Sequence, residues 1–295
     1  MESCSFQTSP NTVIHAQITR PAKEHSKPLL LFLHYWGGSS QTWHKLTDLN
    51  SSTSLSELYP TIAIDLRGWG QSTGPSDESS KAYSIHGMAS DVATLITHLN
   101  KDKARHDLLE HGLLLVGHSM GAKVALATIG LLGNDLRKFL KGLVLIGPAP
   151  PIALDLPPDM KAQQLLAYES EDSVRWTVHN VLAKPENLSD SDIELVVRDS
   201  LSGTPFAKAG WLSYGMQEDI SQDVRKALAS RPGMRASVIV GELDIVETRE
   251  RAEKEVANFL RPNGVEVSLT VVEGVRHLIP LEKPESIYKE ICRYW

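Results

Sequence analysis

The apolar positions of this chain form short continuous runs that are separated by stretches with helical periodicity. The runs predict seven strands, at residues 12–18, 29–34, 61–65, 113–118, 142–147, 236–241 and 267–272. The central runs are continuous rather than alternating, as in parallel strands that are covered on both faces. The stretches between them predict helices at residues 85–99, 120–132, 248–260 and 284–294. Strands that alternate with helices predict an α/β fold with a doubly wound, mostly parallel sheet.

Residues 150–230 break this alternation. They open with the proline-rich stretch PAPPIALDLPPD and contain no good strand pattern. Their helical patterns lie near residues 159–168, 171–182, 189–201 and 205–215. We therefore predict a core made of residues 1–149 and 231–295, with residues 150–230 as a helical insertion.

Composition narrows the class of protein. The 295 residues, of which 41% are hydrophobic, are enough for one large α/β domain with an insertion. The formal net charge of -6 and the absence of a Lys/Arg block argue against a nucleic-acid partner. No apolar run approaches the ~20 residues of a membrane span, and no secretory signal is visible. We expect a cytoplasmic protein with Cys4 and Cys292 reduced and no metal or cofactor.

The stretch LLLVGHSMGAK, residues 113–123, places Ser119 at a tight corner between a buried strand and a buried helix. Such a corner projects the hydroxyl at the carboxyl end of the strand, where open α/β sheets bind ligands. Gly117 and Gly121 suit it because side chains there would collide with the neighbouring strand or helix. The pattern G-x-S-x-G predicts a nucleophile. The alternative is an ordinary helix N-cap serine.

A serine nucleophile needs a base and a group that orients the base. His277 follows the last strand, and Asp244 follows the strand before it, so both are expected at the same edge of the sheet as Ser119. Two other acids compete with Asp244. Glu242 is placed too close to its strand, and Glu247 is interpreted as the first turn of the next helix.

The oxyanion of an acyl-transfer intermediate needs N–H donors. We expect one from Met120, the residue after the serine. We expect the second from Trp36, in the glycine-rich loop of LFLHYWGGSSQTW. The alternative for this loop is an ordinary tight turn between a strand and a helix.

Together these motifs resemble the α/β-hydrolase fold family, in its lidded esterase and lipase-like branch. The stretches that carry the resemblance are HYWGGS (34–39), DLRGWGQS (65–72), GHSMGA (117–122), GELDIV (241–246) and GVRHLIPLEKPE (274–285). The resemblance implies a Ser119, Asp244 and His277 triad, with Trp36 and Met120 as the oxyanion hole. It also implies that the insertion caps the pocket.

The chain departs from this family at Tyr35, where glycine is usual. We treat Tyr35 as a candidate substrate contact, together with Trp176, Trp211 and Tyr214 of the insertion. Asp65 and Arg67 are expected to fix a turn; a nucleophilic Asp65 is the lesser alternative.

These features predict a serine hydrolase that cleaves a carboxylic ester or lactone of a small apolar substrate through an acyl-enzyme. Serine at the corner argues against the dehalogenases and epoxide hydrolases that resemble this chain but use aspartate there. Two alternatives stay open: C–C hydrolase, perhydrolase or lyase chemistry on the same triad, and a protein that binds a small ligand with little turnover. Neither substrate identity nor oligomeric state follows from the sequence.

Overall fold

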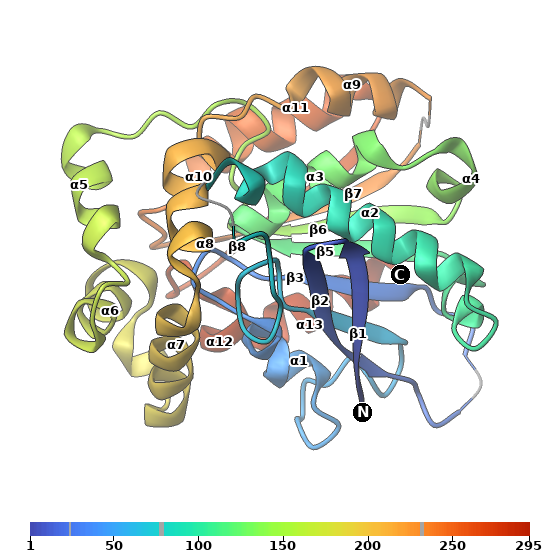
Figure 1. Cartoon of the computed structure of the whole chain (residues 1–295), viewed down its shortest axis with the longest axis horizontal. Helices are drawn as coiled ribbons and strands as arrows, with labels where there is room; N and C mark the ends of the chain where they lie inside the picture. Colours follow the sequence, from blue (N-terminus) through green and yellow to red (C-terminus); the bar gives the residue numbers. More distant parts are fainter. Residues whose placement is uncertain (24, 77–79, 231–232) are drawn as a thin grey trace.

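The computed structural model of the chain describes residues 1–23, 25–76, 80–230 and 233–295 (Figure 1). These residues form an eight-stranded sheet in the order β1-β2-β4-β3-β5-β6-β7-β8. The strands are β1 (Glu2–Ser9), β2 (Thr12–Thr19), β3 (Leu29–Leu33), β4 (Thr61–Ile64), β5 (Leu113–His118), β6 (Leu140–Ile146), β7 (Arg235–Gly241) and β8 (Glu266–Val272). In this sheet order, every pair of neighbouring strands from β4 to β8 is parallel. The pairs β1–β2 and β2–β4 are antiparallel. The predicted doubly wound α/β fold is confirmed.

Alternate residues of the central strands face two different hydrophobic cores. In β3, Leu29, Leu31 and Leu33 belong to one core, while Leu30 and Phe32 belong to the other. The first core packs under α2 (Ile85–Lys101), α3 (Met120–Leu131) and α9 (Ser221–Ala229). The second packs under α1 (His44–Thr47), α12 (Ile279–Glu282) and α13 (Pro284–Tyr294), on the opposite face of the sheet in Figure 1. Burial on both faces explains the continuous apolar runs.

The first strand, β1, carries no comparable run. Phe6 is its only buried residue, because β1 is the edge strand and pairs with β2 alone. The remaining short helices of the core are α4 (Asn134–Arg137), α10 (Arg249–Arg251) and α11 (Asn258–Leu260), with a π-helical segment at Ala252–Ala257 between the last two. No helix in the described ranges is long and apolar enough to cross a membrane.

Between β6 and β7 the chain leaves the sheet and forms α5 (Pro158–Leu166), α6 (Glu171–Thr177), α7 (Asp190–Ser202) and α8 (Pro205–Gly210). These helices stand beside the sheet in Figure 1. Helix α9 follows them and packs against α3 of the core. The predicted end of the insertion, between residues 230 and 231, falls at residues 231–232, which lie outside the described residues.

The two ends of this insertion lie together. The N–H of Leu154 donates to the carbonyl of Met216 at 2.7 Å, and the N–H of Ile220 donates to the carbonyl of Pro151 at 2.8 Å. The insertion therefore leaves and re-enters the core through one narrow neck.

A buried lysine of α3 supports the neck. Lys123 is fully buried, and its Nζ donates to the carbonyls of Ile152 at 3.0 Å and Met216 at 3.3 Å. Burial lowers the pKa of Lys123 to about 8. The ammonium group thus connects the helix behind Ser119 to both ends of the insertion.

Candidate active site

Ser119 stands in a strained backbone conformation between β5 and α3. Its φ of 55° and ψ of -116° make it the one non-glycine residue with positive φ in the described part of the chain. Its side chain makes no capping hydrogen bond to α3, so the N-cap interpretation does not hold. Backbone strain of this kind costs about 1–3 kcal/mol and concentrates at functional sites. The conformation instead presents the Ser119 side chain to a cavity at the carboxyl end of the sheet.

The two flanking glycines allow this corner to be close-packed. A Cβ on Gly117 would lie 2.4 Å from the carbonyl oxygen of Gly121, at the start of α3. A Cβ on Gly121 would lie 2.3 Å from the carbonyl oxygen of Leu33, at the end of β3. Both distances are shorter than carbon and oxygen tolerate, so the helix and strands can approach this closely only with glycine here.

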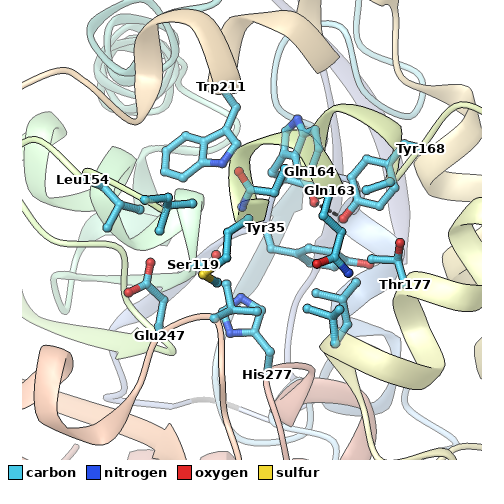
Figure 2. A pocket seen from close by; sticks show the side chains of 17 residues that line it. Tyr35, Ser119, Leu154, Gln163, Gln164, Tyr168, Thr177, Trp211, Glu247 and His277 are labelled. Atoms are coloured by element: carbon cyan, nitrogen blue, oxygen red, sulfur yellow. Dashed lines mark hydrogen bonds between the residues drawn. The ribbon is translucent and has the colours of Figure 1, made fainter. Parts of the chain in front are cut away.

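His277 and Asp244 form a buried pair beside Ser119. His277 Nδ1 lies 2.7 Å from Asp244 Oδ2, and both side chains are almost completely buried. Asp244 Oδ1 accepts the N–H groups of Val246 at 2.8 Å and Glu247 at 3.0 Å, which fixes the carboxylate. Burial disfavours the imidazolium, but the Asp244 carboxylate outweighs it and raises the pKa of His277. With Nδ1 directed to Asp244, Nε2 is the ring nitrogen available to the cavity that His277 and Ser119 share (Figure 2).

The two competing acids of this loop lie in different places. Glu242 is exposed, and its Oε2 accepts the N–H of Gly274 at 2.8 Å. Glu247 is 1% exposed and lines the cavity. The interpretation of Glu247 as a first helical turn is wrong, because α10 begins at Arg249 and Thr248 is its N-cap. The side chain of Glu247 therefore points into the cavity. The sequence could not predict this direction, because it depends on the path of the loop before α10.

The loop after β3 presents Trp36 at the cavity wall. In the described residues, no hydrogen bond is formed by the backbone N–H of Trp36 or of Met120. The carbonyl of Trp36 accepts the Tyr168 hydroxyl at 2.8 Å, and its indole Nε1 donates to the carbonyl of Lys208 at 3.1 Å. The insertion thus holds both the backbone and the ring of Trp36. Trp36 lines the cavity, whereas Met120 is 1% exposed and is not among the residues that line it.

The backbone of Tyr35 is unstrained, although the resemblance described above would place a glycine at this position. Its φ is not positive; Gly37 carries the left-handed conformation of this loop, with φ of 99°. Tyr35 is 2% exposed and lines the cavity, and its ring centroid lies 5.1 Å from that of His118. His118 Nε2 donates to the carbonyl of His277 at 2.8 Å, so His118 supports the loop that carries His277.

The insertion supplies most of the remaining cavity wall. Trp211 lines the cavity, as do three polar residues that the sequence analysis did not single out: Gln163, Gln164 and Thr177 (Figure 2). Trp176 and Tyr214 do not line it. Trp176 is 51% exposed because Val174 and Thr177 form the buried side of α6. Tyr214 is 37% exposed, since Trp211 and Gly215 are the buried residues of its π-helical turn.

Asp65 lies outside this cavity wall. Its carboxylate accepts the N–H groups of Ser40 at 2.6 Å and Gln71 at 2.8 Å and pairs with His15 Nδ1 at 3.0 Å. These bonds hold the turn after β4, as expected. In the described ranges, no group of three or more His, Cys, Asp or Glu side chains could hold a metal ion.

Comparison with known proteins identifies the fold family of the chain. The model of a family described as "Alpha/beta hydrolase family" matches residues 30–290. A soluble epoxide hydrolase of a Corynebacterium species is 28% identical over 286 residues, which cover 90% of this chain and 89% of the relative. Protein phosphatase methylesterase 1 of Pongo abelii is 27% identical over 173 residues, which cover 57% of this chain and 40% of the methylesterase. The structure of a malate-bound thermophilic esterase from Thermogutta terrifontis shares the fold, with a TM-score of 0.70, 21% identity and coverage of 100% of this chain and 98% of the esterase.

Proposed function

The chain belongs to the alpha/beta hydrolase family, and on that premise we propose that it is a serine hydrolase that cleaves a carboxylic ester or lactone of a small apolar substrate. One observation carries the proposal. Ser119, in its strained corner, shares a cavity with His277, whose Nδ1 lies 2.7 Å from a fixed Asp244 carboxylate. Serine rather than an acidic residue stands at the corner, which favours an acyl-enzyme over the epoxide opening named for one relative.

The mechanism follows from these groups. His277 Nε2 takes the proton of the Ser119 hydroxyl while Oγ attacks the substrate carbonyl, and Asp244 stabilises the resulting imidazolium. The N–H groups of Met120 and Trp36 bind the oxyanion. Each such donor is typically worth about 3 kcal/mol of the barrier. The imidazolium then protonates the leaving alcohol, and water, deprotonated by the same histidine, releases the acid and regenerates Ser119.

We assign residues 150–230 to a cap that shapes the substrate site. Most of the cavity wall that faces Ser119 and His277 comes from this segment, and it is largely apolar: Leu154, Leu156, Met160, Ala167, Tyr168, Val181, Leu182 and Trp211. An apolar wall of this kind favours small apolar acyl or alcohol groups.

Hydrolysis of p-nitrophenyl esters from acetate to decanoate, by the wild type and by Ser119→Ala, tests the proposal. We expect turnover in the wild type and a loss of at least about 10³-fold in the variant. Equal rates in both proteins would exclude Ser119 as the nucleophile. A wild type that is inactive on every ester but cleaves a β-diketone, or uses hydrogen peroxide, would replace ester hydrolysis with one of those reactions.

A further inference from the structure

A second acidic side chain, Glu247, lines the cavity beside Ser119 and His277 but has no part in the proposed mechanism. It is 1% exposed, and Figure 2 shows its carboxyl group near Ser119 and Leu154 at one end of the cavity. Carboxyl groups are rarely buried without a full set of partners. A buried acid at the apolar end of a substrate cavity therefore calls for a role.

The protein provides only part of a partner set for this carboxyl group. Glu247 Oε2 lies 3.3 Å from Arg251 Nη1, a long contact for an ion pair. Arg251 Nη1 is closer to the carbonyl of Val246, at 2.8 Å. No donor from the described residues forms a hydrogen bond with Glu247 Oε1. One oxygen of the group is thus left for whatever fills the cavity.

Four titratable groups, each on a different segment of the chain, interact electrostatically with Glu247. Arg251 on α10 and His277 after β8 favour its anion, whereas Asp244 in its own loop disfavours it. The charge of Glu247 also reaches Lys123 on α3, since Glu218 and, to a lesser extent, Glu247 act to raise the pKa of that lysine. Burial dominates and raises the pKa of Glu247 to about 8, despite Arg251. At neutral pH the group is therefore mostly a neutral acid, which can donate a hydrogen bond as well as accept one.

We propose that the Glu247 carboxyl group determines substrate specificity by donating a hydrogen bond to a second oxygen of the substrate, such as a ketone oxygen, at a distance from the scissile carbonyl. This inference rests on the proposed esterase function. A substrate with only alkyl groups would leave the donor unpaired in an apolar wall, and such a loss typically changes binding about 10-fold.

The test uses two pairs of esters, because the oxygen can belong to either side of the ester. The acyl pair is p-nitrophenyl pentanoate and p-nitrophenyl 4-oxopentanoate; the alcohol pair is butyl pentanoate and 3-oxobutyl pentanoate. The measured quantity is the ratio of kcat/KM for the ketone to kcat/KM for the alkyl ester. General losses of activity and the titration of His277 cancel in this ratio.

We expect the ratio to fall about 10-fold in Glu247→Leu for at least one pair. In the wild type the same ratio should also fall between pH 7 and 9, because the ionised carboxylate can no longer donate. Glu247→Gln keeps a donor that does not titrate, so its ratio should be independent of pH. Glu250→Gln is the matched control, since this exposed acid lies three residues away and lines no part of the cavity.

Two results would overturn the inference. One is a ratio that is the same in the wild type and Glu247→Leu for both pairs. The other is a wild-type ratio that stays constant from pH 7 to 9, which applies even if Glu247→Leu fails to fold. The proposed function fails separately, and this inference with it, if the wild type hydrolyses none of the four esters.

Discussion

The hydroxyl of Tyr168 donates a hydrogen bond of 2.8 Å to the carbonyl oxygen of Trp36, and the two rings are in tilted contact, with centroids 4.2 Å apart and planes inclined by 38°. Tyr168 belongs to the insertion, whereas Trp36 belongs to the loop after β3. This bond restrains the peptide next to the N–H that we propose as an oxyanion donor. A residue of the insertion therefore restrains the loop that carries the proposed oxyanion donor.

Replacing Tyr168 with phenylalanine removes the hydroxyl and keeps the ring in contact with Trp36. We expect kcat on p-nitrophenyl esters to fall about 5- to 10-fold, because a single hydrogen bond of this kind is worth about 1 kcal/mol. Tyr214→Phe, at an exposed tyrosine of the same insertion, is the control and should keep the wild-type kcat. A Tyr168→Phe enzyme with unchanged kcat would show that the bond does not position the donor.

The Asp244→Asn substitution tests the buried pair. An amide that donates to His277 Nδ1 forces the wrong tautomer, so we expect kcat to fall about 10⁴-fold. The control is Glu242→Gln, an exposed acid of the same loop, which should retain activity. If Glu242→Gln caused the larger loss, the assignment of the acid would be wrong.

The same variant has a predicted pH signature. The Asp244 carboxylate stabilises the imidazolium and raises the pKa of His277, and only the neutral ring acts as a base. Wild-type activity should therefore rise with pH as His277 loses its proton. In Asp244→Asn the residual activity should reach its plateau at a lower pH, because the stabilising charge is gone. A pH–rate profile of kcat/KM measures the shift, and an upward displacement would contradict it.

The backbone strain at Ser119 should affect the free energy of unfolding of variants at this position. A residue with φ of 55° and ψ of -116° suits glycine better than alanine, so Ser119→Gly should be more stable to unfolding than Ser119→Ala by about 1 kcal/mol. Urea denaturation of the two inactive variants measures this difference. A more stable Ser119→Ala would mean that the corner relaxes without its hydroxyl.

Gly121→Ala should destabilise the protein by about 3 kcal/mol, since its Cβ would lie 2.3 Å from a backbone oxygen that cannot move without shifting β3. Gly133→Ala is the matched control, because a Cβ there meets no atom within 4 Å. Thermal unfolding compares the two. Similar melting temperatures would show that β3 and α3 can move apart with little loss of stability.

The sequence predicted the sheet because its central strands are buried on both faces, which leaves continuous runs such as Leu29–Leu33. It missed β1, whose single buried residue, Phe6, gives no pattern. Side-chain direction was harder to predict. Glu247 turns into the cavity because it precedes α10, which starts at Arg249, and Trp176 turns out because of the face that α6 buries. Such details depend on where a turn begins, and apolar periodicity does not fix that to within one or two residues.

The narrow neck at Pro151 and Ile220 has a consequence for how this protein can change. Because the ends of the insertion meet, the segment closes on itself, and its length and contents can vary without displacing any strand. A graft that keeps two carbonyls for the Lys123 ammonium group would preserve the junction with α3. It would also have to supply a hydroxyl in the place of Tyr168. Under the proposed function, exchanging the insertion should change the substrate range without displacing the sheet, provided that the replacement keeps these three contacts.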